Sequence, residues 1–365
     1  MISRAFDFLA RRIDGPLMAA LAIAFAVGLA VVYSASGGST LDRTMGQVRN
    51  LGVALVALWV LAQIHPQFLM RLALPFYAGA LVLVIGVAVF GEIRLGARRW
   101  LNLGFTTIQP SEMMKIAVPL CLAWYFHRRE EGLRWYDYTV AGVILMVPVL
   151  LIARQPDLGT AVLVFASGFF VIFLAGLSWK LIGGLAVAGA AALPLLWNLL
   201  HDYQKRRILT LIDPTQDPLG AGYHIIQSTI AIGSGGLMGK GWLNGTQSQL
   251  DFLPERSTDF IFAVFGEEFG FVGAALLVLL YLLIIARGLM IAYNASTVFA
   301  RLTAGAITLT FFTYAFVNMG MVSGILPVVG VPLPLISYGG TALLSMLAGF
   351  GILMSISTHK QLVAS

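Results

Sequence analysis

The sequence is short of charge, cysteine and histidine, and each shortage excludes a class of protein. Asp, Glu, Lys and Arg make up only 11% of the 365 residues, whereas soluble globular proteins contain about 25%. The one cysteine, Cys121, excludes an intrachain disulfide and any cysteine-based zinc cluster. The five histidines form neither an HExxH pattern nor a close pair. The chain is therefore neither a disulfide scaffold nor a histidine–cysteine metal protein.

Hydrophobic residues are abundant instead. They make up 59% of the chain, and the mean hydropathy is +0.87. One water-soluble core cannot bury this much apolar surface, so the sequence predicts an integral membrane protein. The net charge of +6 is spread along the chain without a Lys/Arg-rich tail. That distribution is typical of membrane topology and of contact with membrane lipid, and no nucleic-acid partner is expected.

Apolar segments of about 20 residues, the length that crosses the hydrocarbon core, recur along the chain. We therefore expect an all-α polytopic membrane protein with about ten spans, forming one domain over residues 1–365. The expected spans are 16–35, 47–64, 72–91, 110–127, 138–154, 158–175, 180–199, 260–287, 298–322 and 337–357. Only three residues, 155–157, separate the fifth span from the sixth, which predicts a tight helical hairpin.

The distribution of Lys and Arg predicts that both termini are cytoplasmic. That orientation places about eleven of these residues in inner segments and about six in short outer loops. Arg94, Arg98 and Arg99 then share one outer loop against the usual bias, and the long outer segment 200–259 carries five further cations. A basic outer face indicates an anionic ligand, with solvated loop charge as the alternative. The apolar and glycine-rich stretches of 200–259 predict short amphipathic or re-entrant pieces beside a cavity open to the outer side.

Ionisable residues at membrane depth are costly, so each suggests a function. Glu112 and Lys115 lie three residues apart near the start of the fourth span and therefore share a helical face. Two interpretations remain open. The pair either holds the helix as an ion pair, or Glu112 orients Lys115 toward an anionic group.

Asp259 lies where the long outer segment meets an apolar run. A carboxylate half removed from water there has a raised pKa and can serve as a base. The alternative is a helix N-cap, a common place for Asp. Glu267 and Glu268 follow about two turns later, and at least one must face protein or water; they either pack against the outer segment or serve the site.

Three further stretches carry structural predictions. Asp157, between Pro156 and Gly159, suits the start of the sixth span as a cap. The prolines before Ser337 predict a rigid outer loop, followed by small residues that allow close packing. The small residues of 183–192 predict either a groove open to lipid or tight helix packing.

Taken together, the polar motifs resemble those of the SEDS family (shape, elongation, division and sporulation) of polytopic membrane glycosyltransferases. The matching stretches are Gly96-Ala-Arg-Arg-Trp100, Gln109-Pro-Ser-Glu112 with Lys115, Gln155-Pro-Asp-Leu-Gly-Thr160, His201-Asp-Tyr-Gln204, Arg206-Arg-Ile208, Gly222-Tyr-His224, Gln227-Ser228, Gly233-Ser-Gly-Gly236, Gly239-Lys-Gly241, Leu253-Pro-Glu255, Thr258-Asp-Phe-Ile-Phe262, Gly266-Glu-Glu268, Pro332-Leu-Pro334 and Ser337-Tyr-Gly-Gly340. They cover nearly the whole chain in order. The stretch 242–248 is similar to the elongation branch of the family rather than its division branch. Ser257 departs from the histidine more usual at that position.

The resemblance implies a peptidoglycan polymerase that joins lipid II into β-1,4 glycan on the outer face of the bacterial inner membrane. It implies a class B penicillin-binding protein as transpeptidase partner, together with the elongation machinery and the nascent glycan. Inversion at the sugar needs one displacement and one base. The resemblance makes Asp259 the essential acidic residue. Asp259 acts either as that base or as a ligand of a divalent cation such as Mg or Mn, for which Glu112 is a second candidate ligand.

The resemblance and the charges also give two sets of supporting residues. Candidates for the diphosphate and sugars are Arg98, Arg99, Trp100, Glu112, Lys115, Arg206, Arg207, Lys240, Gln247 and Glu255. Candidates for support are Gln109, Asp157, Glu267, Glu268 and Ser337. The alternatives to an elongation polymerase are a lipid II flippase, a non-catalytic scaffold for the transpeptidase and a division-type polymerase.

Overall fold

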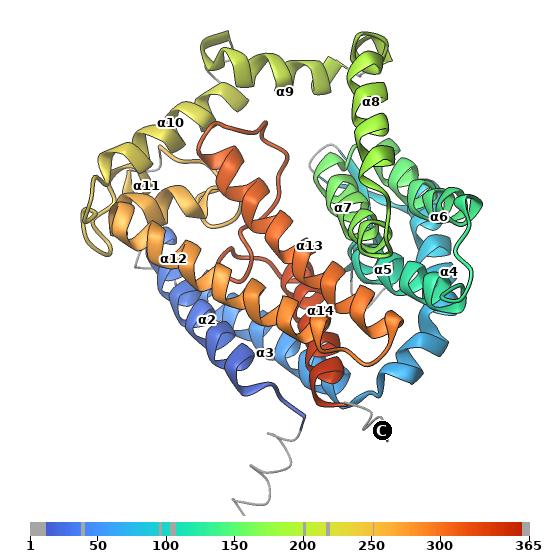
Figure 1. Cartoon of the computed structure of the whole chain (residues 1–365). Helices are drawn as coiled ribbons and strands as arrows, with labels where there is room; N and C mark the ends of the chain where they lie inside the picture. Colours follow the sequence, from blue (N-terminus) through green and yellow to red (C-terminus); the bar gives the residue numbers. More distant parts are fainter. Residues whose placement is uncertain are drawn as a thin grey trace, which may run out of the picture.

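The structure is a computed structural model that describes residues 12–37, 41–94, 97–102, 107–199, 202–216, 220–250 and 252–359. It is built mainly of helices (Figure 1). Their bounds are α2 Gly15–Ala35, α3 Leu41–Gln63, α4 Pro66–Phe90, α5 Pro110–Arg128, α6 Trp135–Arg154, α7 Leu158–Leu174, α8 Trp179–Leu199, α9 Asp202–Ile212, α10 Ala221–Ser234, α11 Thr246–Gln249, α12 Ile261–Tyr293, α13 Val298–Val322 and α14 Thr341–Thr358, with a 3-10 turn at Pro214–Gln216.

The polytopic helical fold predicted from the sequence is confirmed. Each expected span coincides with a helix, and seven helices of the described residues are long and apolar enough to cross a membrane: α2, α3, α4, α6, α12, α13 and α14. The shorter apolar helices are α7 and the first part of α8. The long segment 200–259 folds into short helices, as predicted. The tight hairpin is also present, because α6 ends at Arg154 and α7 begins at Leu158.

A small antiparallel sheet was not predicted. Its strands are β1 Glu92–Arg94, β2 Ala97–Asn102 and β3 Thr107–Ile108, in the order β1-β2-β3. Trp100 pairs with Glu92, and Leu101 with Ile108. The basic outer loop of the sequence analysis is therefore a hairpin. β1 and β3 are too short to show the alternation by which strands are recognised in a sequence, and β2, Ala-Arg-Arg-Trp-Leu-Asn, does not alternate between apolar and polar residues.

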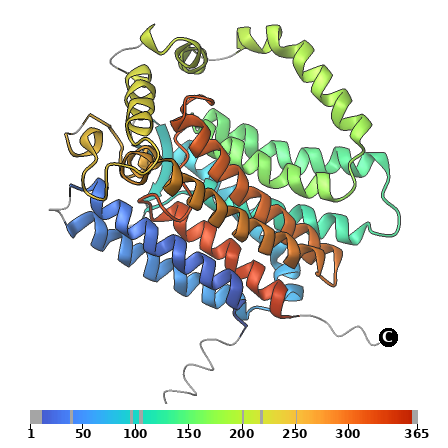
Figure 2. The same ribbon diagram turned by 60° about the vertical axis from the view of Figure 1, so that its left-hand side comes forward.

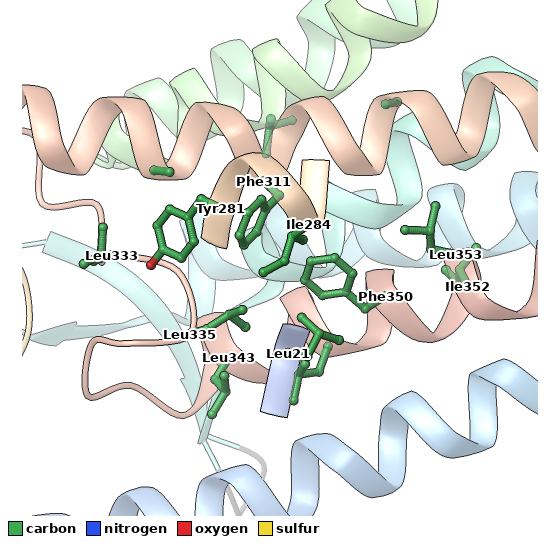
Figure 3. Close-up of a cluster of buried hydrophobic side chains, with 14 of the residues drawn as sticks. Leu21, Tyr281, Ile284, Phe311, Leu333, Leu335, Leu343, Phe350, Ile352 and Leu353 are labelled. Atoms are coloured by element: carbon green, nitrogen blue, oxygen red, sulfur yellow. The ribbon is translucent and has the colours of Figure 1, made fainter. Parts of the chain in front are cut away.

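The bundle is organised around α13, which packs against α12, α7, α5 and α14, while α14 also packs along α3. Figure 3 shows part of the core, where Phe311 and Phe350 meet residues of α2 and α12. The Tyr281 hydroxyl donates a hydrogen bond of 2.5 Å to the carbonyl of Pro334. This bond ties the loop between α13 and α14 to the apolar core.

One part of the fold stands apart from the bundle. Helix α8 leans away from the other helices, and α9 bridges it to α10 (Figures 1 and 2). A Cβ placed at Gly183, Gly184 or Gly189 would meet no heavy atom within 4 Å. Tight helix packing, one interpretation of these small residues, is therefore wrong in this structure.

Helix α12 is interrupted at Gly270, where φ is 65° and ψ is −164°. The segment 236–241 fits into the interruption and supplies the missing backbone partners. Phe271 N–H donates to the Gly236 carbonyl at 2.9 Å, and Gly241 N–H donates to that of Glu268 at 2.9 Å. The break in the helix is therefore satisfied by the neighbouring loop.

We expect Gly270→Ala to lower the thermal stability of the protein. Glycine adopts this backbone conformation readily, whereas in any other residue it costs about 1–3 kcal/mol of strain. The added Cβ would also lie 2.3 Å from the Gly239 nitrogen. The melting temperature of the purified protein in detergent measures the effect. Gly86→Ala in α4 is the matched control, because its Cβ would meet nothing within 4 Å. Equal melting temperatures for the two variants would contradict the prediction.

Candidate active site

Asp259 comes directly before α12 and does not cap it. The N-cap position of α12 is Phe260, and no side-chain hydrogen bond caps this helix. The N-cap interpretation of Asp259 is therefore wrong. Within the described part of the chain, its half-buried carboxylate has charged neighbours but accepts no hydrogen bond.

Three charged side chains surround the Asp259 carboxylate. Burial, and after it the charge of the nearby Glu255 carboxylate, raise the pKa of Asp259 to about 6, although Arg207 and Arg99 act in the opposite direction. The structure thus brings together residues from the β-sheet, from α9 and from the segment before α12. A carboxyl with a pKa near 6 is ionised at neutral pH and is more basic than an ordinary aspartate, which suits proton abstraction.

Arg99 joins this group to the hairpin between α6 and α7. Its Nη2 donates to the carbonyl of Pro156 at 2.6 Å, and its Nη1 lies 3.8 Å from Oδ1 of Asp157. Asp157 caps α7 as predicted, accepting from the N–H of Thr160 at 3.3 Å, and its other oxygen accepts from Gln109 at 3.1 Å. Arg99 is therefore held in a fixed network between two carboxylates, Asp157 and Asp259.

The backbone around Asp259 is held by two polar side chains. Ser337 Oγ donates to the Thr258 carbonyl at 2.6 Å and accepts from Leu333 N–H at 2.7 Å. Fully buried Asn318 donates to the carbonyls of Asp259 and Val331, at 2.8 and 2.7 Å. Asn318 was not among the residues predicted from the sequence. An amide in an otherwise apolar span was the signal that could have found it.

The predicted pair of Glu112 and Lys115 is present and buried, with 2.6 Å between Lys115 Nζ and Glu112 Oε1. Lys115 also donates to the Tyr314 hydroxyl, and Ser345 donates to the other Glu112 oxygen at 2.7 Å. A cavity of about 40 Å³ adjoins Lys115, enough for one water molecule. Tyr314 also interacts electrostatically with Asp157, so the pair lies close to the network of Arg99.

The structure places Lys240, Gln247, Glu267 and Glu268 in a separate cluster. Lys240 Nζ and the backbone N–H of Gln247 both meet Oε1 of Glu267, at 2.7 and 3.0 Å, and Glu268 accepts from Ser34. Glu267 lies six residues beyond Ile261, the first residue of α12, which is about 9 Å at the rise of an α-helix. Both glutamates are buried, so the packing interpretation describes them, and Lys240 is paired here rather than beside Asp259.

Of the remaining predicted residues, the structure describes the side chain of Trp100 alone. Trp100 is half-exposed on β2, and successive residues of a strand face opposite sides, so it points away from Arg99. The side chains of Arg98 and Arg206 lie outside the described residues, as does His201. No group of three or more His, Cys, Asp or Glu side chains is arranged to hold a metal ion within the described ranges. Whether Asp259 acts as base or metal ligand stays a prediction.

A polytopic helical bundle with a carboxylate and arginines gathered at one end is the architecture expected of an integral membrane enzyme acting on an anionic substrate. The family model for FtsW, RodA and SpoVE, described as "Cell cycle protein", matches residues 16–362. The chain belongs to this family.

Known proteins are similar to this chain in sequence or structure over most of its length. It is 55% identical over 337 residues to the peptidoglycan glycosyltransferase MrdB of Escherichia coli K12, covering 92% of this chain and 90% of that protein. A solved chain from "Structural coordination of polymerization and crosslinking by a peptidoglycan synthase complex" matches with a TM-score of 0.81 and 34% identity, over 94% of this chain and 97% of that one. The rod shape determining protein RodA of Thermus thermophilus matches with a TM-score of 0.72 and 29% identity, over 96% and 98%.

Proposed function

We propose that this protein is a peptidoglycan glycosyltransferase that joins lipid II into β-1,4 glycan strands during cell elongation and the maintenance of rod shape. One structural observation carries the proposal: the Asp259 carboxylate, whose pKa is raised, lies near enough to Arg99 and Arg207 for both guanidinium groups to act on it electrostatically. The named activity of the E. coli relative supports it.

The chemistry follows from these charges. The Asp259 carboxylate takes the proton from the acceptor 4-hydroxyl as that oxygen attacks the anomeric carbon of the donor. The bond from this carbon to the pyrophosphate oxygen breaks, inverting the configuration and releasing polyprenyl pyrophosphate. Arg99 and Arg207 stabilise the negative charge that develops on the leaving group. Glu255 keeps the base from becoming too weak by raising its pKa.

The alternative role for Asp259 is to bind a divalent cation. Glu112, the second ligand expected from the sequence, is not free to bind the cation, because Lys115 and Ser345 donate hydrogen bonds to its two oxygens. Asp259 and Glu255 are the carboxylates near the arginines. These two, with the substrate diphosphate, would hold a Mg or Mn ion if one takes part.

We propose that the protein lies in the bacterial inner membrane with both termini cytoplasmic and with Asp259 on the outer side. Its partner would be a class B penicillin-binding protein, which cross-links the product. A groove of about 270 Å³ between α12 and α13, lined by Leu282, Phe312 and Phe316 among others, is open and apolar. It suits the membrane helix of that partner, consistent with the synthase complex to which the chain is similar.

The test of this function is glycan synthesis by the purified full chain. Labelled lipid II would be incubated with and without the transpeptidase partner and with and without Mg, and the products separated by size. Strands of many units are the expected result. If lipid II crosses vesicle membranes and no strand forms under any condition, the protein is a flippase instead.

The pH dependence of the rate gives a more specific prediction. The activity should rise through a midpoint near pH 6, where Asp259 loses its proton. Glu255→Gln should shift this midpoint down, because a neighbouring negative charge is removed, and Arg207→Gln should shift it up. Initial rates between pH 4.5 and 8.5 measure the shifts, with exposed Arg154→Gln as control. Shifts in the opposite directions would place the titrating group elsewhere.

A further inference from the structure

The end of the bundle remote from Asp259 carries a second, unrelated set of cations. Helix α5 begins at Pro110, next to Gln109 and the Asp157 network, and ends at Arg128, about 27 Å away at the rise of an α-helix. Helices α4 and α5 lie side by side (Figure 1). At that far end a cavity of about 540 Å³ opens between them. Arg71, Leu74, Trp124 and Arg128 are among its lining residues. Its volume is within the range of ligand-binding pockets.

The two arginines of this cavity have no carboxylate counterion in the part of the chain that the structure describes. Within the described residues, neither Arg71 nor Arg128 has a carboxylate within 4 Å, and both are exposed. Their neighbours are different: Arg129 lies 3.8 Å from Asp137, and His127 lies 3.3 Å from Glu130. The Arg128 guanidinium stacks over the Trp124 ring at 5.0 Å, which holds it at the cavity. The cavity therefore presents two unneutralised positive charges from two adjacent helices.

Apolar groups line the cavity one helical turn deeper in the bundle. On α4, Leu74 and Pro75 follow Arg71 by three and four residues and so lie on the same face above it. On α5, Trp124 precedes Arg128 by four residues and so lies on the same helical face, one turn deeper in the bundle. Both walls thus run from cation at the helix end to apolar surface toward the membrane interior. This order matches an amphiphile whose anionic group lies at the membrane surface and whose chain points inward.

We propose that this cavity, formed by Arg71, Leu74, Trp124 and Arg128, binds an anionic phospholipid. The two guanidinium groups bind the headgroup phosphate, and one acyl chain lies along Leu74 and Pro75. A soluble anion would leave the apolar wall unused, and an acidic peptide would have to cover exposed apolar side chains at membrane depth. In the proposed orientation the lipid belongs to the cytoplasmic leaflet, whose anionic lipids attract basic sites of this kind. The site is separate from glycan synthesis.

Native mass spectrometry of the full chain tests the proposal by counting retained lipids. Phosphatidylglycerol and phosphatidylcholine would be titrated in parallel, with inorganic phosphate and the acyl-free headgroup glycerophosphoglycerol as further probes. The variants are Arg71→Gln/Arg128→Gln and, as a charge-matched control at the same end, Lys180→Gln/Arg301→Gln. Lys180 and Arg301 are exposed and lie outside the cavity.

Wild type should retain one phosphatidylglycerol in preference to phosphatidylcholine by about tenfold or more, since each arginine near a membrane surface strengthens such binding several-fold. The Arg71→Gln/Arg128→Gln protein should lose most of this preference, and the control should keep it. Stabilisation by phosphatidylglycerol in a melting experiment should follow the same order, which separates lost binding from misfolding. Equal retention by both variants would overturn the proposal. So would phosphate or the free headgroup binding as tightly as whole lipid.

Discussion

Asp259→Ala is expected to lower the rate of glycan polymerisation by about 10²- to 10⁴-fold, the usual contribution of a general base. The variant loses the group that accepts the proton of the attacking hydroxyl, whereas Arg99 remains held by Pro156 and Asp157. Size-resolved products from labelled lipid II measure the loss. Asp42→Ala is the control, because Asp42 is an exposed carboxylate in the first turn of α3. Full activity in Asp259→Ala would remove this residue from the chemistry.

Removing the charge of Asp259 is expected to lower activity but to raise the stability of the folded protein. Because the pKa of Asp259 is raised from 3.8 to about 6 on folding, its ionisation opposes folding, and stability is lost as the pH rises through the folded pKa. Asp259→Asn should therefore melt a few degrees above wild type at pH 8, with the difference vanishing near pH 4. Melting curves at the two pH values test this sign. A less stable Asp259→Asn protein at pH 8 would show that the carboxylate supports the fold.

Breaking the buried ion pair is expected to have the largest effect on stability. Lys115→Met leaves the Glu112 carboxylate buried with only Ser345 as a donor, and loss of one partner of a buried pair costs about 3–5 kcal/mol. The double variant Glu112→Gln/Lys115→Met removes both charges and should recover most of that loss. Melting temperatures or denaturant titration compare these proteins, with exposed Lys180→Met as control. A single variant as stable as the double would contradict the ion-pair interpretation.

The double variant also separates the two interpretations of this pair that the sequence left open. If the pair only holds the helices, the recovered protein should polymerise lipid II at a rate close to wild type. If Lys115 binds an anionic group of the substrate, the protein should be folded and inactive. The contact of Lys115 with Tyr314, which interacts in turn with Asp157, is the route by which the pair could influence the site.

The helices could be predicted from the sequence because an apolar run of span length has few alternatives in a membrane. Asp157 as a cap and Glu112 with Lys115 as a pair were predictable for a similar reason, since both depend on residues within one turn. The sheet was not, because β1 and β3 are only three and two residues long and the six residues of β2 do not alternate between apolar and polar. The grouping of the charges was not predictable either. Lys240 and Arg207 are similar cations of one outer segment, and only tertiary packing directs one to Glu267 and the other to Asp259.

The candidate site is assembled from segments that are far apart in the chain, and this has a consequence for biosynthesis. Arg99 and Asp157 are made early, whereas Ser337, which holds the carbonyl of Thr258, comes roughly 240 residues after Arg99. At ordinary translation rates that interval lasts about 10 to 50 s. During this time the ribosome-bound chain holds charged groups at the membrane without the contacts that position Asp259. Catalytic competence should therefore appear late, after α13 and the following loop have entered the bundle.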